Sequence, residues 1–207
     1  MSLNYRANEK GDIDSVILHW PQSIQLASDQ FFEFCQANKE LRIERTAEGD
    51  FEIMTPTGWE TGRKNLSLAA QLYIWAEQDG TGVATDSSTG FILPNGAMRS
   101  PDVSWVKKTK LAQLTPEQRQ RFLPLCPDFV IELCSPSDHL KKLQDKMQEY
   151  RDNGAGLGWL IDPEQKRVYE YQPEQEMVLF DNPQILLGND LLKGFVLNLG
   201  KVWEGES

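Results

Sequence analysis

The groups best suited to chemistry lie between Pro101 and Lys146, where two acids and a lysine occur near apolar segments. Asp102 follows the proline that opens one apolar segment, and Glu132 stands inside the apolar run 129–134. A carboxylate inside such a run is costly to desolvate unless a cation or hydrogen bonds compensate it. Two carboxylates and an ammonium are the groups that metal-dependent hydrolysis of a phosphodiester requires.

The two acids are expected on neighbouring strands of one sheet. Consecutive strands usually lie side by side, so Asp102 and Glu132 would present their carboxylates at the same place. Two oxygen ligands from adjacent strands, completed by water and phosphate, are typical of Mg²⁺ sites, and Mn²⁺ is expected to substitute. Glu132 also has a purely structural interpretation, as an edge-facing or salt-bridged acid.

Lys146 lies on the helix predicted to follow the Glu132 strand, at the border of that helix's apolar face. Because a lysine stem can cover apolar surface while its ammonium extends beyond it, the head group can reach towards the strand ends. There it would orient an attacking water and offset charge on a phosphoryl group. The alternative is a solvated lysine, like the nearby Lys141 and Lys142, which are expected on the outer side of the helix.

A sheet and two helices must hold these groups in place. A helix is predicted over residues 60–79, ended by Gly80, and a second runs from the start signal at 135–138 to Gly154. Strands are predicted at 83–85, 90–93, 102–106, 129–134, 158–161 and 167–171, the first three as a meander. We expect a core in the order helix, strand, strand, strand, helix, strand, which predicts an α/β fold with a mixed central sheet.

The first long helix carries apolar residues at helical spacing that are expected to face the core: Leu66, Ala69, Ala70, Tyr73 and Ile74. Before it, residues 1–20 are expected to be frayed ahead of an edge strand or loop. A short helix capped by Ser28 and a hairpin of 41–45 with 51–54 should follow. Beyond residue 171, short strands are expected to cover the sheet.

Composition limits the function classes. The net charge is −10, from 31 acidic and 21 basic residues, and such a surface repels phosphate backbones at long range. This charge argues against tight nonspecific binding of nucleic acid. The three cysteines form no CxxC pair, which indicates reduced thiols. With no apolar run of membrane-spanning length and no signal-peptide pattern, we expect a cytoplasmic protein with no membrane partner.

Taken together, the motifs are similar to those of a known family. They are Ser100-Pro101-Asp102-Val103, the Glu132 strand followed by Ser135-Pro136-Ser137, Lys146 ahead of Tyr150, and Trp159-Leu-Ile-Asp162-Pro163. This combination resembles the Uma-two family of restriction endonuclease-like proteins, part of the PD-(D/E)xK nuclease superfamily. The likeness covers most of the chain, from Ser28 to near Tyr171.

The resemblance implies a restriction-endonuclease-like core with a mixed central sheet, plus an N-terminal helix and hairpin and C-terminal short strands. We expect a single domain over residues 1–207, with its core at about residues 60–172. Asp102 and Glu132 would bind the metal, and Lys146 would be the catalytic lysine. Cys134 stands where the wider superfamily has its lysine, so Lys146 would replace that lysine from the helix.

A further carboxylate in such sites often comes from the first core helix, and Glu60 is the candidate for it. Glu60 also fits a first-turn acid favoured by the helix dipole, and both interpretations stay open.

The expected activity is Mg²⁺-dependent endonucleolytic hydrolysis of phosphodiester bonds, with DNA as the substrate. Two alternatives stay open. One is a binding or regulatory module on a nuclease-like fold without turnover, and the other is a hydrolase of another substrate, such as a glycosidase using Asp102 and Glu132. The specificity, the physiological role and the oligomeric state also stay open, with a homodimer as one alternative.

Overall fold

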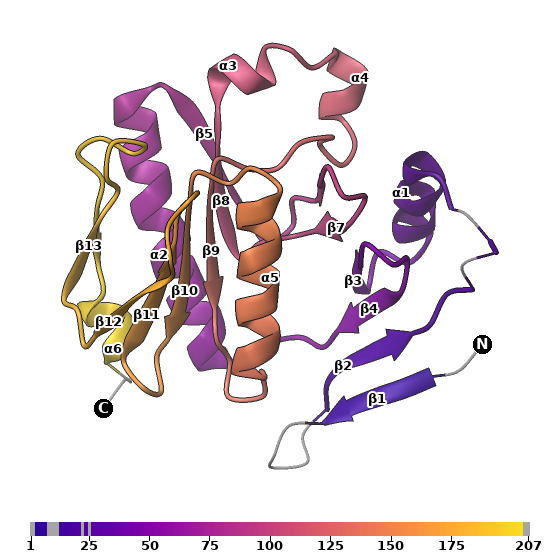
Figure 1. The fold of residues 1–207 in the computed structure, drawn as a ribbon, viewed down its shortest axis with the longest axis horizontal. Coiled ribbons are helices and arrows are strands. Elements are labelled where there is room, and N and C mark those ends of the chain that lie inside the picture. The colour runs from indigo at the N-terminus through magenta and orange to yellow at the C-terminus, as the bar shows by residue number, and fades with distance from the viewer. Residues whose placement is uncertain (1–2, 8–12, 22, 25, 205–207) are drawn as a thin grey trace.

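The part of the chain that the structure describes forms two six-stranded sheets, a small two-stranded sheet, and helices that pack mainly on one of the large sheets (Figure 1). The computed structural model describes residues 3–7, 13–21, 23–24 and 26–204. None of the helices in these ranges combines the length and the apolar character needed to span a bilayer.

The central sheet contains the strands on which Asp102 and Glu132 were expected. In spatial order its strands are β12 (Val178–Asp181), β11 (Arg167–Tyr171), β10 (Leu157–Asp162), β9 (Phe129–Leu133), β8 (Val103–Lys107) and β5 (Gly82–Asp86). Strands β9 and β10 are parallel, and the other neighbours are antiparallel. The sheet is therefore mixed, which confirms the predicted fold class.

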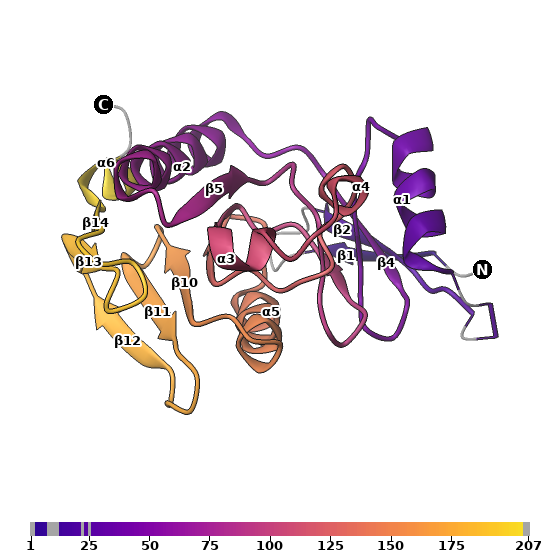
Figure 2. The same cartoon turned by 90° about the horizontal axis from the view of Figure 1, so that it is seen from above.

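Two long helices cover opposite faces of the central sheet, α2 (Trp59–Asp79) and α5 (Leu140–Asp152) (Figure 2). Strand β9 contributes Phe129, Ile131 and Leu133 to the core cluster on the α2 side, and Val130 to the cluster on the α5 side. Because side chains alternate along a strand, Glu132 shares the α5 face with Val130. This alternation turns the buried acid towards the helix that carries Lys146.

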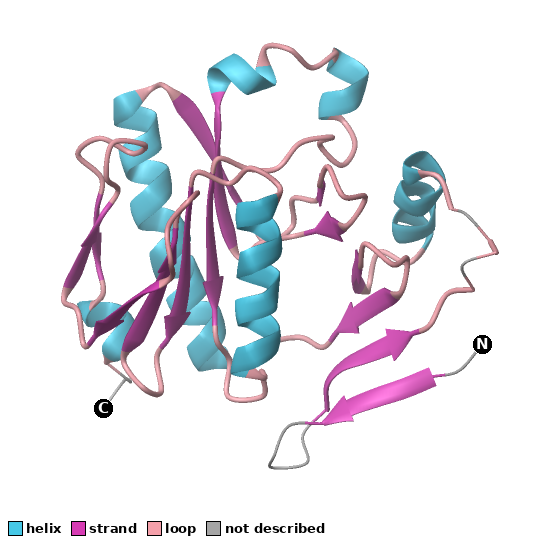
Figure 3. Ribbon diagram, in the orientation of Figure 1, coloured by secondary structure: helices cyan, strands magenta, loops and turns pink. Residues whose placement is uncertain are grey.

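The second large sheet lies beside this core, on the side away from the C-terminal strands (Figure 3). In spatial order it contains β1 (Leu3–Ala7), β2 (Ile13–Leu18), β4 (Phe51–Met54), β3 (Arg42–Arg45), β7 (Met98–Arg99) and β6 (Phe91–Ile92). The predicted hairpin of β3 and β4 is confirmed.

Two expectations about strands are wrong. The start of the chain is not a frayed segment throughout, because β1 pairs with β2. Strand β2 also pairs directly with β4, although a helix separates the two strands in the sequence. The predicted meander is also interrupted, because β6 and β7 pair with each other and β7 joins β3 through Arg45 and Met98. The β2–β4 and β3–β7 pairings join segments far apart in the sequence, so no local pattern reveals them.

The core-facing side of α2 also differs from the prediction. Leu66, Tyr73 and Ile74 are 70%, 55% and 57% exposed, whereas Leu68 and Leu72 are fully buried. Two stripes of the helix satisfy helical spacing, and the sheet covers the stripe that contains the two leucines. The end of the helix is as predicted, since Gly80 adopts a left-handed conformation with φ of 71°.

Helix α5 begins at Leu140 rather than at Pro136. Residues 135–138 instead form a turn, in which the Asp138 carboxylate accepts the Ser135 N–H at 2.7 Å. The predicted apolar face is confirmed at its three buried positions, Leu143, Met147 and Tyr150. The smaller elements are α1 (Ser28–Ala37), α3 (Lys108–Leu111), α4 (Pro116–Arg119), β13 (Ile185–Leu187), β14 (Val196–Asn198) and α6 (Gly200–Trp203).

Candidate active site

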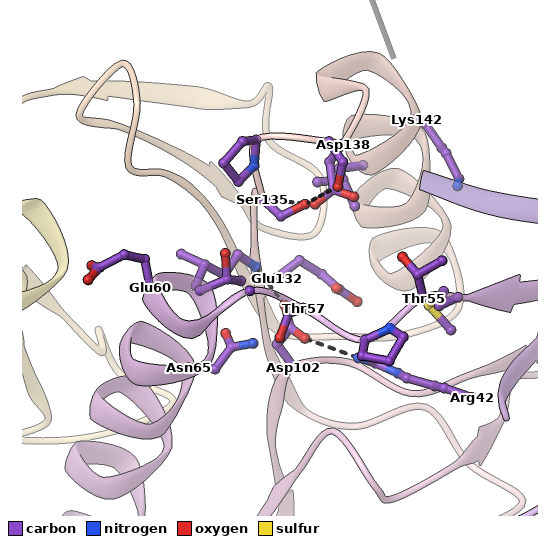
Figure 4. Close-up of a pocket in the computed structure, with 18 of the residues that line it drawn as sticks. Arg42, Thr55, Thr57, Glu60, Asn65, Asp102, Glu132, Ser135, Asp138 and Lys142 are labelled. Atoms are coloured by element: carbon purple, nitrogen blue, oxygen red, sulfur yellow. Dashed lines mark hydrogen bonds and ion pairs between the residues drawn. The ribbon is translucent and has the colours of Figure 1, made fainter. Parts of the chain in front are cut away.

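A pocket of about 590 Å³ lies where β3, the start of α2, the end of β9 and α5 meet (Figure 4). All four residues predicted from the sequence line it: Glu60, Asp102, Glu132 and Lys146. Among the described residues, its lining contains six acidic and three basic side chains. An anion entering this pocket therefore meets an excess of negative charge unless further positive charge accompanies it.

Asp102 and Glu132 come from neighbouring antiparallel strands. The register pairs Val103 with Ile131, so one step further along both strands Asp102 lies opposite Glu132. Residues opposite each other in an antiparallel pair point to the same face, with Cβ atoms about 4.5–5.5 Å apart. The backbone N–H of Leu133 also donates to Asp102 Oδ2 at 3.0 Å, which fixes the aspartate beside the end of β9.

Lys146 extends from α5 to the same place. Its Nζ lies 2.8 Å from Oε1 of Glu132, and only 11% of the lysine side chain is exposed. The Tyr150 hydroxyl, one turn further along α5, donates to the same Glu132 oxygen at 3.0 Å. The predicted convergence of two carboxylates and one ammonium is therefore present in the structure.

The ionisation of these groups follows from their burial and their neighbours. Burial raises the pKa of Glu132 to about 7, with Asp102 and Glu44 adding to the rise and Lys146 opposing it. Burial would lower the pKa of Lys146, but Glu132 and Glu44 together raise it above its ordinary value. The lysine is thus a fixed positive charge, whereas the Glu132 carboxyl can exchange a proton near neutral pH.

Sequence reasoning missed Glu44, which is 1% exposed on β3. Its Oε1 accepts Lys146 Nζ at 3.0 Å, and its Oε2 lies 3.2 Å from Nη1 of Arg99. Arg99 in turn donates through Nε to Glu149 at 2.6 Å. Burial would raise the pKa of Glu44, but Lys146, Arg99 and Arg42 lower it to about 2. In the sequence, Glu44 is visible only as a polar position in the alternating pattern of the hairpin. Its partners are distant in the chain, so no local motif indicates its role.

Arg42, two residues earlier on β3, was also missed. Its Nη2 donates to the Ser100 carbonyl at 2.6 Å, and its Nη1 lies 3.6 Å from Oδ1 of Asp102. Residues 42 and 44 lie on the same side of a strand, so β3 directs a cation towards Asp102 and a carboxylate towards Lys146. The N-terminal sheet therefore contributes to the pocket.

Glu60 lines the pocket, but its carboxylate does not converge with those of Asp102 and Glu132. Its carboxylate pairs with Arg63 Nη2 at 3.1 Å, and 47% of its side chain is exposed. Figure 4 shows it pointing away from Asp102 and Glu132. In this arrangement its geometry matches the first-turn acid, the second interpretation left open by the sequence.

The neighbouring lysines of α5 differ from each other. Lys141 is 81% exposed in its side chain and pairs with Asp145, as expected for the outer side of the helix. Lys142 is not on the outer side, because it lines the pocket and forms an ion pair with Glu52 of β4.

Cys134, two residues after Glu132, does not supply a charge. Burial raises the pKa of its thiol, and nearby acids, first Asp162, add to the rise. The cysteine thus remains a neutral thiol, and Lys146 supplies the ammonium next to Glu132.

The carboxylates of the pocket are potential ligands of a divalent cation. Within the described part of the chain, no group of three or more His, Cys, Asp and Glu side chains is arranged to hold a metal ion. Mg²⁺ commonly uses only one or two carboxylates and completes its shell with water and substrate phosphate. The pair of Asp102 and Glu132 fits this mode of binding, and does not fit an all-protein cage.

Two buried polar atoms in the pocket lining lack partners. Oδ1 of Asn65 and Nε of Arg42 have no hydrogen bond to any described residue. Leaving such atoms unpaired costs about 1–3 kcal/mol each. Figure 4 shows Asn65 directed from α2 towards the part of the pocket near Asp102. The pocket lining therefore contains one unpaired acceptor and one unpaired donor.

Comparison with known proteins agrees with this architecture. A model of the Uma2 family, described as "Putative restriction endonuclease", matches residues 28–200. A crystal structure from Anabaena variabilis ATCC 29413, described as a putative nuclease belonging to DUF820, superposes with a TM-score of 0.69 at 19% identity, covering 86% of this chain and 98% of that one. At that identity the likeness shows the fold. No protein with a curated description matches the chain. Because the family model covers most of the sequence, the chain belongs to the Uma2 family.

Proposed function

We propose that the protein is a Mg²⁺-dependent endonuclease that hydrolyses phosphodiester bonds in DNA, with Mn²⁺ as a substitute. Asp102 and Glu132 hold the cation, and Lys146 is the catalytic lysine. The observation that carries this proposal is the meeting of these three side chains in one pocket, with Lys146 Nζ 2.8 Å from Glu132. Membership of the Uma2 family supports the same class of activity.

The charge of the pocket supports the metal requirement. With six acids against three basic groups in the lining, a phosphodiester alone would be repelled. When bound, a divalent cation would polarise the phosphate and lower the pKa of a water molecule.

The protein's own groups have separable roles in this proposal. Lys146 keeps its positive charge because two carboxylates flank it, and it orients the attacking water and offsets charge on the phosphoryl oxygens. Tyr150 donates to Glu132 and keeps the carboxylate directed at the pocket. Asn65 and Arg42 offer their unpaired atoms to the substrate. Direct displacement by water needs no covalent intermediate.

The test is cleavage of supercoiled, linear duplex and single-stranded DNA with Mg²⁺, with Mn²⁺ and with EDTA. Wild-type protein should cut in either metal and not in EDTA, while Asp102→Asn and Glu132→Gln should not cut. Asp128→Asn is the matched control, because it removes another buried carboxylate beside β9 that lies outside the pocket.

Two other results would redirect the proposal. Metal binding without turnover on any nucleic acid would favour a binding or regulatory module. Hydrolysis of another substrate that persists in EDTA would favour an enzyme using Asp102 and Glu132 as an acid pair.

A further inference from the structure

Strand β3 connects Lys146 to the backbone that precedes Asp102. Oε1 of Glu44 accepts both the Lys146 ammonium at 3.0 Å and the Ser100 N–H at 2.9 Å. One oxygen atom therefore links the helix that carries the lysine to the segment that carries the aspartate. Arg99 holds the other oxygen of the same carboxylate at 3.2 Å, so the glutamate has little freedom to turn.

The lysine needs such a second contact. With Glu132 as its sole anionic partner, the ammonium would be drawn to the carboxylate that is proposed to hold the cation. Two carboxylates on different elements divide this attraction and fix the ammonium between them. A positioned charge contributes far more at a reacting centre than a mobile one, because no reorganisation is needed during the reaction.

We propose that Glu44 is a positioning residue that holds the Lys146 ammonium in place for catalysis. This inference rests on the proposed nuclease function. It extends the site from the central sheet to the N-terminal sheet, and it assigns a role to a buried acid outside the proposed metal pair.

The fold provides a matched control. Glu52 lies opposite Glu44 in the β3–β4 hairpin, is 6% exposed, and forms an ion pair with Lys142, one helical turn before Lys146 on α5. The two glutamates thus form two Glu–Lys pairs between the same sheet and the same helix. Glu52→Gln removes a pair of the same kind without removing a contact of Lys146.

The first experiment compares steady-state cleavage of a labelled oligonucleotide by wild type, Glu44→Gln and Glu52→Gln. Glu44→Gln is expected to lower kcat by about 30-fold or more and to change KM by less than about threefold. Glu52→Gln is expected to lower kcat much less than Glu44→Gln does, because both contacts of Lys146 remain in place. Equal losses of kcat in the two variants would show that Glu44 only attaches the sheet to the helix.

The second experiment needs no activity and remains informative if Glu44→Gln is unstable. Denaturant unfolding is measured for Glu44→Gln, Lys146→Met and the double variant, and for Glu52→Gln combined with Lys146→Met. Residues in direct contact give non-additive losses, whereas independent ones add. The proposal requires a double loss smaller than the sum for Glu44 with Lys146, and a near-additive loss for Glu52 with Lys146. Additive losses in both pairs would overturn it.

The two experiments separate this inference from the function on which it rests. If wild-type protein cuts no nucleic acid, the nuclease function fails and the catalytic role of Glu44 fails with it. If wild-type protein cuts and Glu44→Gln cuts equally fast, the nuclease function stands and the positioning role is wrong.

Discussion

Two buried carboxylates lie at opposite ends of strand β9 and have different surroundings. Asp128, 5% exposed, precedes the strand and accepts the Lys107 N–H at 2.9 Å and Lys110 Nζ at 3.1 Å. Glu132, 3% exposed, lies near the other end and shares its pocket with Asp102 and Glu44. The first acid is neutralised by the side chain of a partly exposed lysine, and the second is crowded by like charges.

This difference shows which buried acids indicate function. Burial is common to both residues, so burial alone does not distinguish them. Glu132 differs in its neighbours: burial raises its pKa to about 7, and Asp102 and Glu44 add to the rise although Lys146 opposes it. The candidate site is distinguished by a cluster of acids whose negative charge the neighbouring lysine and arginine side chains do not fully neutralise.

The largest expected contrast concerns the lysines that pair with these two acids. Lys146→Ala should lower DNA hydrolysis by at least about 100-fold, because it removes a positioned charge at the reacting centre. Lys110→Ala removes the corresponding partner of Asp128 and should leave the rate within about twofold. Initial rates in saturating Mg²⁺ measure both.

Circular dichroism and metal titration of Lys146→Ala are the controls, since the variant should fold and still bind Mn²⁺. Equal rates for wild type and Lys146→Ala would remove the lysine from the mechanism.

Metal-dependent stabilisation should also separate the two acids. Millimolar Mg²⁺ or Mn²⁺ should raise the melting temperature of wild type, since binding to the folded state at about 100 times Kd stabilises it by about 2.7 kcal/mol. Glu132→Ala should abolish this rise, whereas Asp128→Asn should retain it. Differential scanning fluorimetry across a metal series measures the shift, and a full rise in Glu132→Ala would place the cation elsewhere.

Without metal, substitution of the two acids should change the free energy of unfolding differently. Glu132→Gln should be neutral or stabilising, because it removes repulsion from Asp102 and Glu44. Asp128→Asn should lower the free energy of unfolding by about 1–3 kcal/mol, because it weakens a buried acceptor of the Lys107 N–H. Urea unfolding in EDTA measures both changes. A larger loss in Glu132→Gln than in Asp128→Asn would contradict the comparison.

The smallest contrast is in pH dependence. A carboxyl whose folded pKa is raised from 4.5 to about 7 keeps its proton in the folded state after the unfolded state has lost it. Its stabilising contribution is complete below the unfolded value and is lost as pH rises through the folded value. Metal-free wild type should therefore lose up to about 2 kcal/mol relative to Glu132→Gln between pH 5 and pH 7. Parallel stability profiles for the two proteins would show that Glu132 titrates normally.

Local pattern predicted the central sheet, the end of α2 at Gly80, and the convergence of Asp102, Glu132 and Lys146. These features depend on adjacent strands and on helical spacing, which a sequence displays directly. The sequence does not show which stripe of α2 faces the core, because two stripes have similar spacing. Packing against the sheet determines which of them is buried. Glu44 could not be assigned either, because its partner Lys146 lies 102 positions away in the chain.

The most direct test of the account is a crystal structure of the protein soaked in Mn²⁺, with the ion located by its anomalous signal. We predict one peak that both carboxylates contact, at about 2.0–2.3 Å from an oxygen of Asp102 and of Glu132, and its loss in Glu132→Gln crystals. A peak held by other acids of the pocket, or no peak at metal concentrations that support cleavage, would contradict the proposed site.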